Sequence, residues 1–205
     1  AHPEYWTELD AQPSPPFAAM EEAGFVCPYG SGPESFKVWG WEKTVPAMRA
    51  LRRVRVLMNC HGKVPQGEGL KKMDAVDARG TRGWDALWFS IGSFLLAFDD
   101  VVRNGFMNFT VWEYQSYFWL DEFDPKLLHL GRARGGSFKA GDVHLREFDD
   151  GWVAVNPTTK AAAGISVPAG TARVLDHDNF KNPEAVPPVS RFDLGARRGV
   201  VLLKQ

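Results

Sequence analysis

The fold of the C-terminal third of this 205-residue chain is decided by the stretch Val143-His144-Leu145-Arg146-Glu147-Phe148-Asp149-Asp150-Gly151-Trp152-Val153-Ala154-Val155-Asn156-Pro157. The run at residues 143–148 alternates between apolar and polar residues, the triplet Asp149-Asp150-Gly151 turns, and the β-prone run at residues 152–157 returns, which predicts a β-hairpin. Further short β-prone runs follow at residues 171–175, 191–194 and 199–203, with no helical repeat among them. The sequence therefore predicts an all-β antiparallel sandwich module over residues 137–205.

Upstream of this module, a helix with a strongly apolar stripe is predicted at about residues 83–99. Its apolar residues recur at spacings of three and four: Trp84, Leu87, Trp88, Ile91, Phe94, Leu95 and Phe98. β-prone runs at residues 54–59 and 106–112 precede and follow it. Strand, helix and strand in succession predict βαβ units with a parallel sheet. A shorter helix is predicted to start at Thr44 and Pro46, because a cap residue and a proline are typical of a first turn.

Several motifs in the second half of the chain resemble the end of a glycoside hydrolase-like family. In order they are Phe118-Trp119-Leu120-Asp121-Glu122-Phe123-Asp124, Leu130-Gly131-Arg132-Ala133, Arg146-Glu147-Phe148-Asp149-Asp150-Gly151-Trp152-Val153-Ala154-Val155-Asn156-Pro157-Thr158, and the closing strand Gly199-Val200-Val201-Leu202-Leu203. The resemblance covers residues 54–205 and implies a carbohydrate-related ancestry. In that family a (β/α)₈ barrel is followed by a β-sandwich tail.

Together with the strand-helix-strand pattern, the resemblance implies an α/β fold class. Residues 1–20 contain Pro13, Pro15 and Pro16 and are expected to be an irregular lead-in. Residues 21–136 are expected to be the C-terminal units of a partial TIM-type barrel, and residues 137–205 the sandwich module. A complete barrel takes about 250 residues. We therefore expect either that another protein chain or segment completes the barrel or that this chain is a degenerate relative of the family. The first residues contain neither an initiator Met nor a signal sequence, and we expect the chain to begin after processing or to be a fragment.

Candidate site residues follow the two predicted strands, because barrel enzymes place their chemistry at the carboxyl ends of strands. Glycoside hydrolysis normally uses two carboxyl groups. Glu113 is the catalytic candidate, with a salt-bridged or cleft-lining role as the alternative, and the second carboxylate is expected outside this chain. Trp112 and Tyr114 are expected to stack on sugar rings, although strand alternation would turn them away from Glu113. Asn59 and His61 are expected to bind substrate hydroxyls, with a structural role as the alternative for His61.

Composition narrows the function classes. The formal net charge of -1 gives no basic excess for a phosphate backbone, which argues against a nucleic-acid partner. The longest apolar stretch is too short for a membrane span. Cys27 and Cys60 lack metal-site spacing but could form one disulfide, and no cofactor motif is present. With the glycosylation pattern Asn108-Phe109-Thr110, these features lead us to expect a secreted or cell-surface protein without cofactor or metal.

Two hypotheses remain open from the sequence. The first is a glycoside hydrolase-like protein that acts on or binds polysaccharide, with carbohydrate as its partner. The second is a non-catalytic structural or interaction subunit that retains a degenerate glycosidase scaffold within a larger assembly. An incomplete parallel sheet would leave an apolar face and an edge for a partner.

Overall fold

The computed structural model describes residues 3–27, 36–38, 40–62, 69–111, 119–168 and 170–205. It separates into two compact units, Ala1–Tyr117 and Phe118–Gln205, which divide upstream of the boundary expected at residues 136–137. The elements of the first unit are α1 (Glu4–Asp10), β1 (Ala18–Glu21), β2 (Val26–Cys27), β3 (Lys37–Val38), α2 (Trp41–Ala50), β4 (Arg55–Gly62), the 3-10 helix η1 (Gly69–Asp74), α3 (Gly83–Ala97) and β5 (Gly105–Val111). The stretch expected as an irregular lead-in thus contains α1 and most of β1.

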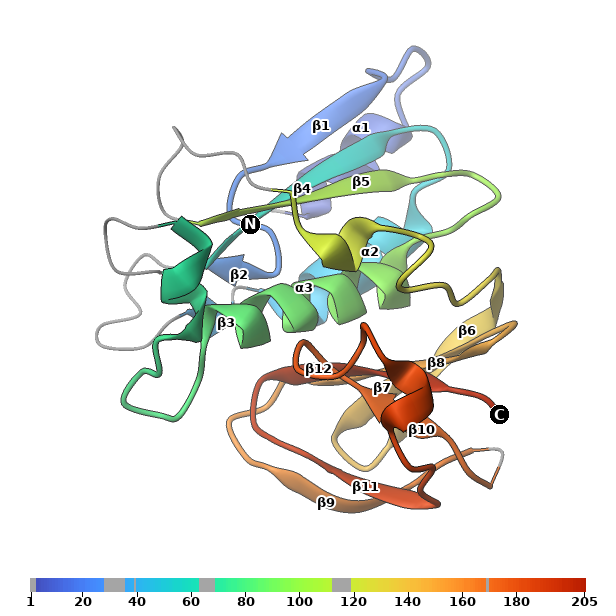
Figure 1. Ribbon diagram of the computed structural model, residues 1–205. Coiled ribbons are helices and arrows are strands. Elements are labelled where there is room, and N and C mark those ends of the chain that lie inside the picture. The colour runs from blue at the N-terminus through green and yellow to red at the C-terminus, as the bar shows by residue number, and fades with distance from the viewer. Residues whose placement is uncertain (1–2, 28–35, 39, 63–68, 112–118, 169) are drawn as a thin grey trace. The chain divides into compact units, whose positions relative to one another are not determined.

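A three-stranded parallel sheet in the order β1-β4-β5 forms the centre of the first unit. Figure 1 shows α2 and α3 along one face of this sheet. Alternation along β4 explains the arrangement, because Val56, Met58 and Cys60 are fully buried on the helix side. Leu57 and Asn59 point to the opposite side, where Leu57 is 36% exposed. One face of the sheet is therefore covered by helices and the other is partly open.

Helix α2 begins three residues earlier than the position expected from Thr44 and Pro46. Gly40 precedes it in the left-handed conformation, with φ 55°. Trp41 opens the helix and donates its indole N–H to the Ser93 hydroxyl on α3 at 2.7 Å. This buried contact between distant segments fixes the helix start, and Pro46 lies inside the helix.

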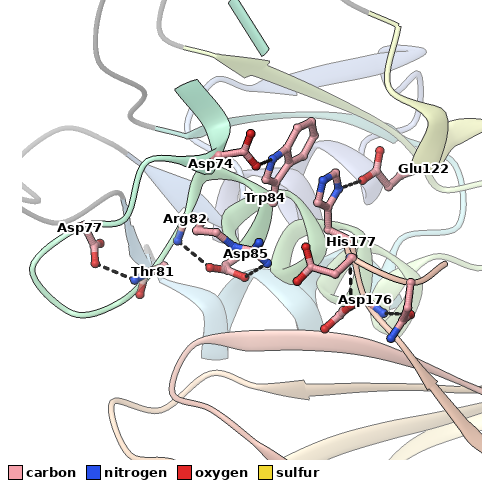
Figure 2. Close-up of polar contacts among 11 residues, drawn as sticks. Asp74, Asp77, Thr81, Arg82, Trp84, Asp85, Glu122, Asp176 and His177 are labelled. Atoms are coloured by element: carbon pink, nitrogen blue, oxygen red, sulfur yellow. Dashed lines mark hydrogen bonds and ion pairs between the residues drawn. The ribbon is translucent and has the colours of Figure 1, made fainter. Parts of the chain in front are cut away.

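Helix α3 confirms the helix predicted from the apolar stripe. Its start is held by Asp85, whose carboxylate accepts the backbone N–H of Arg82 at 2.6 Å. Asp74 accepts the indole N–H of Trp84 at 2.7 Å. Figure 2 shows both contacts, together with the bond from the Thr81 backbone N–H to Asp77. These three aspartates therefore have local structural roles around the start of α3.

The second unit is built from a five-stranded antiparallel sheet in the order β10-β12-β8-β7-β6 and a two-stranded β9–β11 pair. Its elements are the 3-10 helix η2 (Asp121–Phe123), β6 (Ala133–Ala140), β7 (Val143–Phe148), β8 (Gly151–Asn156), β9 (Ala162–Ser166), β10 (Arg173–Leu175), the 3-10 helix η3 (Pro183–Ala185), β11 (Arg191–Leu194) and β12 (Arg198–Leu203). The hairpin expected around Asp150-Gly151 is the β7–β8 pair. Trp152, 2% exposed, lies in the core that strands of both sheets share.

The predicted fold class, α/β with a partial TIM-type barrel, is wrong. Two of the strand pairings among the described residues are parallel and six are antiparallel. The described chain has three α-helices against twelve strands, so it is mainly β. The single βαβ unit β4-α3-β5 adds only β1, and both β1 and β5 pair with β4 alone. A barrel requires every edge strand to gain a neighbour, and the described strands do not supply them.

No helix in the described part of the chain is long and apolar enough to cross a membrane.

Candidate functional site at the carboxyl ends of the parallel strands

The face of the β1-β4-β5 sheet that α2 and α3 leave uncovered carries matched rows of side chains. We call it the open face and define it by Met20, Leu57, Asn59, Phe106, Asn108 and Thr110. Met20, Leu57 and Phe106 stand side by side in one row and are 64%, 36% and 50% exposed. The next rows toward the carboxyl ends pair Asn59 with Asn108 and His61 with Thr110. The face thus changes from apolar to polar toward the edge where parallel sheets commonly bind ligands.

Asn59 and Asn108 form an amide pair on neighbouring strands. The Nδ2 of Asn108 donates to the Oδ1 of Asn59 at 3.1 Å. Asn108 is exposed and Asn59 is half-buried. The bond orients both amides, and an amide offers both a donor and an acceptor. The pair can therefore present hydrogen-bonding groups of both kinds to a molecule on the open face.

His61 lies at the end of β4 but is only 4% exposed. Its Nδ1 is 2.8 Å from the hydroxyl oxygen of Thr110 on β5. Burial lowers the pKa of His61 below its ordinary value of 6.5, and the backbone and carboxylate of Glu22 partly offset that effect. The imidazole is therefore neutral at pH 7. Such a buried ring holds neighbouring strand ends together and does not itself form a ligand surface.

Glu22 follows the last residue of β1 and was not singled out by the sequence. It is exposed, and its carboxylate interacts electrostatically with His61. The residues after it are fixed against β4, because the Gly24 N–H donates to the Asn59 carbonyl at 3.1 Å. The sequence does contain an indication of this strand end, because the pair Glu21-Glu22 follows a short apolar run. The assignment of residues 1–20 to an irregular lead-in left that run without a predicted strand.

Three of the predicted site residues, Trp112, Glu113 and Tyr114, lie outside the described residues. The strand that leads to them, β5, ends at Val111, which pairs with Gly62 of β4. The structure brings Asn59 and His61 onto the same face of β4, as expected for residues two apart in a strand. The catalytic assignment of Glu113 and the stacking roles of its neighbours stay predictions.

The two cysteines are free and buried, so the disulfide alternative does not apply to this structure. Burial raises the pKa of the Cys60 thiol to about 11. A neutral thiol is a poor nucleophile and metal ligand. Among the described residues, no group of three or more His, Cys, Asp or Glu side chains could hold a metal ion.

A second polar cluster lies within the Phe118–Gln205 unit. The Glu122 carboxylate contacts Nδ1 of His177 at 2.7 Å, and the two side chains are 2% and 21% exposed. Figure 2 shows this pair. Beside it, Asp121 forms an ion pair with Lys181. The contacts fasten η2 to the turn after β10, which gives this part of the resembling segment a structural role.

No protein-family model matches the chain, and no curated protein is significantly similar to it. The resemblance to a glycoside hydrolase-like family therefore stays a prediction.

Proposed function

We propose that the protein binds carbohydrate on the carboxyl-terminal half of the open face and hydrolyses glycosidic bonds there. The observation that carries the proposal is the Asn59–Asn108 amide pair beside the half-exposed ring of Phe106. The ordered motifs of the second half of the chain, which resemble a glycoside hydrolase-like family, point to the same substrate class.

The chemistry of these groups suits a sugar ring. Sugar hydroxyls require both donors and acceptors, and the paired amides offer both. A pyranose also has a flat apolar side, which packs well on an aromatic ring such as that of Phe106. Ligand sites commonly combine such apolar surface with a few oriented polar groups.

Binding is tested with a panel of soluble oligosaccharides and calorimetry on the full chain. We expect Phe106→Ala to weaken binding about tenfold, which corresponds to about 1.4 kcal/mol. The control is Phe138→Ala, because Phe138 is similarly exposed, at 44%, but lies on β6 of the other unit. Equal losses in both variants, or no binding of any glycan by the unaltered chain, would contradict the proposal.

Hydrolysis is tested separately with Glu113→Gln, since Glu113 is the catalytic residue predicted from the sequence. We expect this variant to lose hydrolysis while it still binds glycan. Activity equal to that of the unaltered chain would remove Glu113 from the mechanism without affecting the binding proposal.

The alternative function, a non-catalytic interaction subunit, has an observation of its own. The row Met20–Leu57–Phe106 is apolar and exposed, whereas parallel sheets are normally covered on both faces. Light scattering should then find an oligomer that Leu57→Lys dissociates. Val101→Lys is the control, because Val101 is 86% exposed and lies outside the sheet. If the chain stayed a folded monomer at high concentration, self-association through this row would be ruled out.

A further inference from the structure

We propose that the amino-terminal half of the open face is a docking surface for an amphipathic helix of a partner protein. The helix places its apolar side chains on the exposed apolar row and a carboxylate on Arg55. The inference goes beyond the proposed sugar binding and does not depend on it. It is carried by the grouping of exposed apolar side chains, by the charge of Arg55 beside them, and by the dimensions of the sheet.

Exposed apolar side chains gather at this half of the sheet. The apolar row consists of Met20, Leu57 and Phe106, and Phe17 precedes β1 with 68% of its surface exposed. These are four of the ten large apolar side chains that are exposed among the described residues. Single exposed apolar residues are ordinary, whereas a group of them commonly marks an interaction site. Because parallel sheets are normally covered by helices on both faces, the expected cover is a further helix.

Arg55 adds a positive charge beside the apolar row. It pairs with Ala18 in the register, and strand alternation puts it on the same side of β4 as Leu57. Arg55 is half-buried, and its guanidinium carbon lies 4.5 Å from the centre of the Phe17 ring. Within the described ranges of the chain, its guanidinium forms no ion pair with a carboxylate. The ring therefore holds the guanidinium in place, and its N–H donors remain for a carboxylate of the partner.

The charges around the start of β4 leave this end of the sheet positive. Arg52 and Arg53 are exposed and donate their guanidinium N–H groups to backbone carbonyls. The carboxylate of Asp10 accepts the backbone N–H groups of Arg52, Arg53 and Val54 and compensates part of this charge. A partner that carries carboxylates is therefore complementary to this surface, and one that carries Lys or Arg is repelled.

The dimensions of the surface fit one helix. Neighbouring strands lie about 4.8 Å apart, so a row across three strands is about 10 Å wide, close to the diameter of a helix. Arg55 stands one side-chain repeat, about 6.6 Å, from Leu57 along β4. One helical turn rises about 5.4 Å, so an apolar side chain over Leu57 brings a residue one turn away to Arg55. The Asn59–Asn108 pair lies on the other side of the row and remains for a sugar.

Docking is tested with designed Ala-rich peptides of about 20 residues, long enough to form a helix in water. The acidic peptide has a leucine stripe at spacings of three and four and a Glu one turn to either side of it. The basic peptide differs only by Lys in place of each Glu. By fluorescence anisotropy with the full chain, we expect the acidic peptide to bind about tenfold more tightly than the basic one. Arg55→Gln should reduce this preference to less than about threefold, and Arg55→Glu should reverse it.

Two controls locate the binding. Arg191→Gln removes one exposed arginine from β11 of the other unit and should leave the preference unchanged. The NMR signal of the Met20 methyl group should shift on binding, whereas that of the fully buried Met73 of η1 should stay. No binding of the acidic peptide, equal affinities for both peptides, or an unchanged preference in Arg55→Gln would overturn the proposal. Self-association of the chain that shifts the Met20 signal and that the peptide does not reverse would assign the surface to a second copy instead.

Discussion

Replacing Gly24 with alanine tests the close contact that positions the chain after β1. The added Cβ would lie 2.6 Å from Cys60 Sγ, roughly 1 Å inside an ordinary carbon–sulfur contact of about 3.7 Å. Cys60 cannot move away easily, because it is fully buried on the central strand β4. Overpacking of this kind costs about 1–3 kcal/mol. We expect Gly24→Ala to lower the free energy of unfolding of the first unit by about 2 kcal/mol.

Cys60→Ala provides the compensating change. Alone it removes one buried sulfur and should cost about 1 kcal/mol, comparable with a buried methylene group. In the double variant the methyl group added at position 24 occupies the space that the sulfur leaves, so the two losses should not add. We expect a coupling of at least about 1 kcal/mol in urea unfolding followed by tryptophan fluorescence. A neutral Gly24→Ala, or a double variant whose loss equals the sum of the single losses, would refute the packing argument.

Three further changes probe other parts of the chain. Gly151→Ala should destabilise the second unit by about 3 kcal/mol in urea, since its Cβ would overlap the backbone carbonyl of Leu202 on β12; a loss below about 1 kcal/mol would contradict this. Glu122→Ala should cost about 1–3 kcal/mol by removing a hydrogen-bond partner of His177, whereas Glu122→Gln keeps a hydrogen bond and should cost less; equal losses would argue against the pair. The pKa of His61 is lower in the folded protein than in the unfolded chain, so below pH 6.5 unfolding takes up a proton and the free energy of unfolding falls as the pH drops toward the folded pKa. His61→Gln should remove this part of the pH dependence. An unchanged pH profile of stability in this variant would refute the assignment.

Local patterns predicted the elements whose stability is largely local. The β7–β8 hairpin follows from an alternating run before the turn triplet that ends in Gly151 and a β-prone run after it, and α3 from apolar spacing over 15 residues. Helix α3 is nevertheless buried on more than its apolar stripe, since Ser90, Gly92 and Ser93 are also buried. Small residues allow close packing from several sides, which an apolar periodicity alone does not reveal.

Elements that depend on distant partners were missed or misplaced. Strand β1 has only four residues, Ala18–Glu21, and forms because β4 pairs with it in parallel. Strand β4 extends to Gly62, beyond the predicted end at Asn59, because its last residues pair with β5. Strand β6 (Ala133–Ala140) contains the consecutive glycines Gly135 and Gly136, which do not favour a strand, and it forms because β7 supplies its pairing. The barrel expectation failed for the related reason that one βαβ pattern does not specify how many strands join the sheet.

The candidate site was only partly predictable. The end of β4 indicated Asn59 and His61, but only the pairing register reveals Asn108 and Thr110 as their partners. Strand β1 ends at the same edge, and Glu22 follows it, in a segment that carried no recognisable strand pattern. Sequence spacing places residues along one strand, whereas a site at the ends of parallel strands depends on neighbours far away in the chain.

The two functions proposed for the open face depend on different rows of side chains. Side chains on the same face of a strand recur every two residues, so the Leu57 row lies about 6.6 Å from the Asn59 row and about 13 Å from the His61 row. A partner that covers the apolar row could leave the carboxyl edge free, and Phe106 is the residue where the two surfaces meet. The partner would then cover the apolar row and lie next to a sugar bound at the carboxyl edge. Leu57→Lys should therefore affect assembly, whereas Asn108→Ala should affect sugar binding. A variant that changed both would locate the ligand on the apolar row instead.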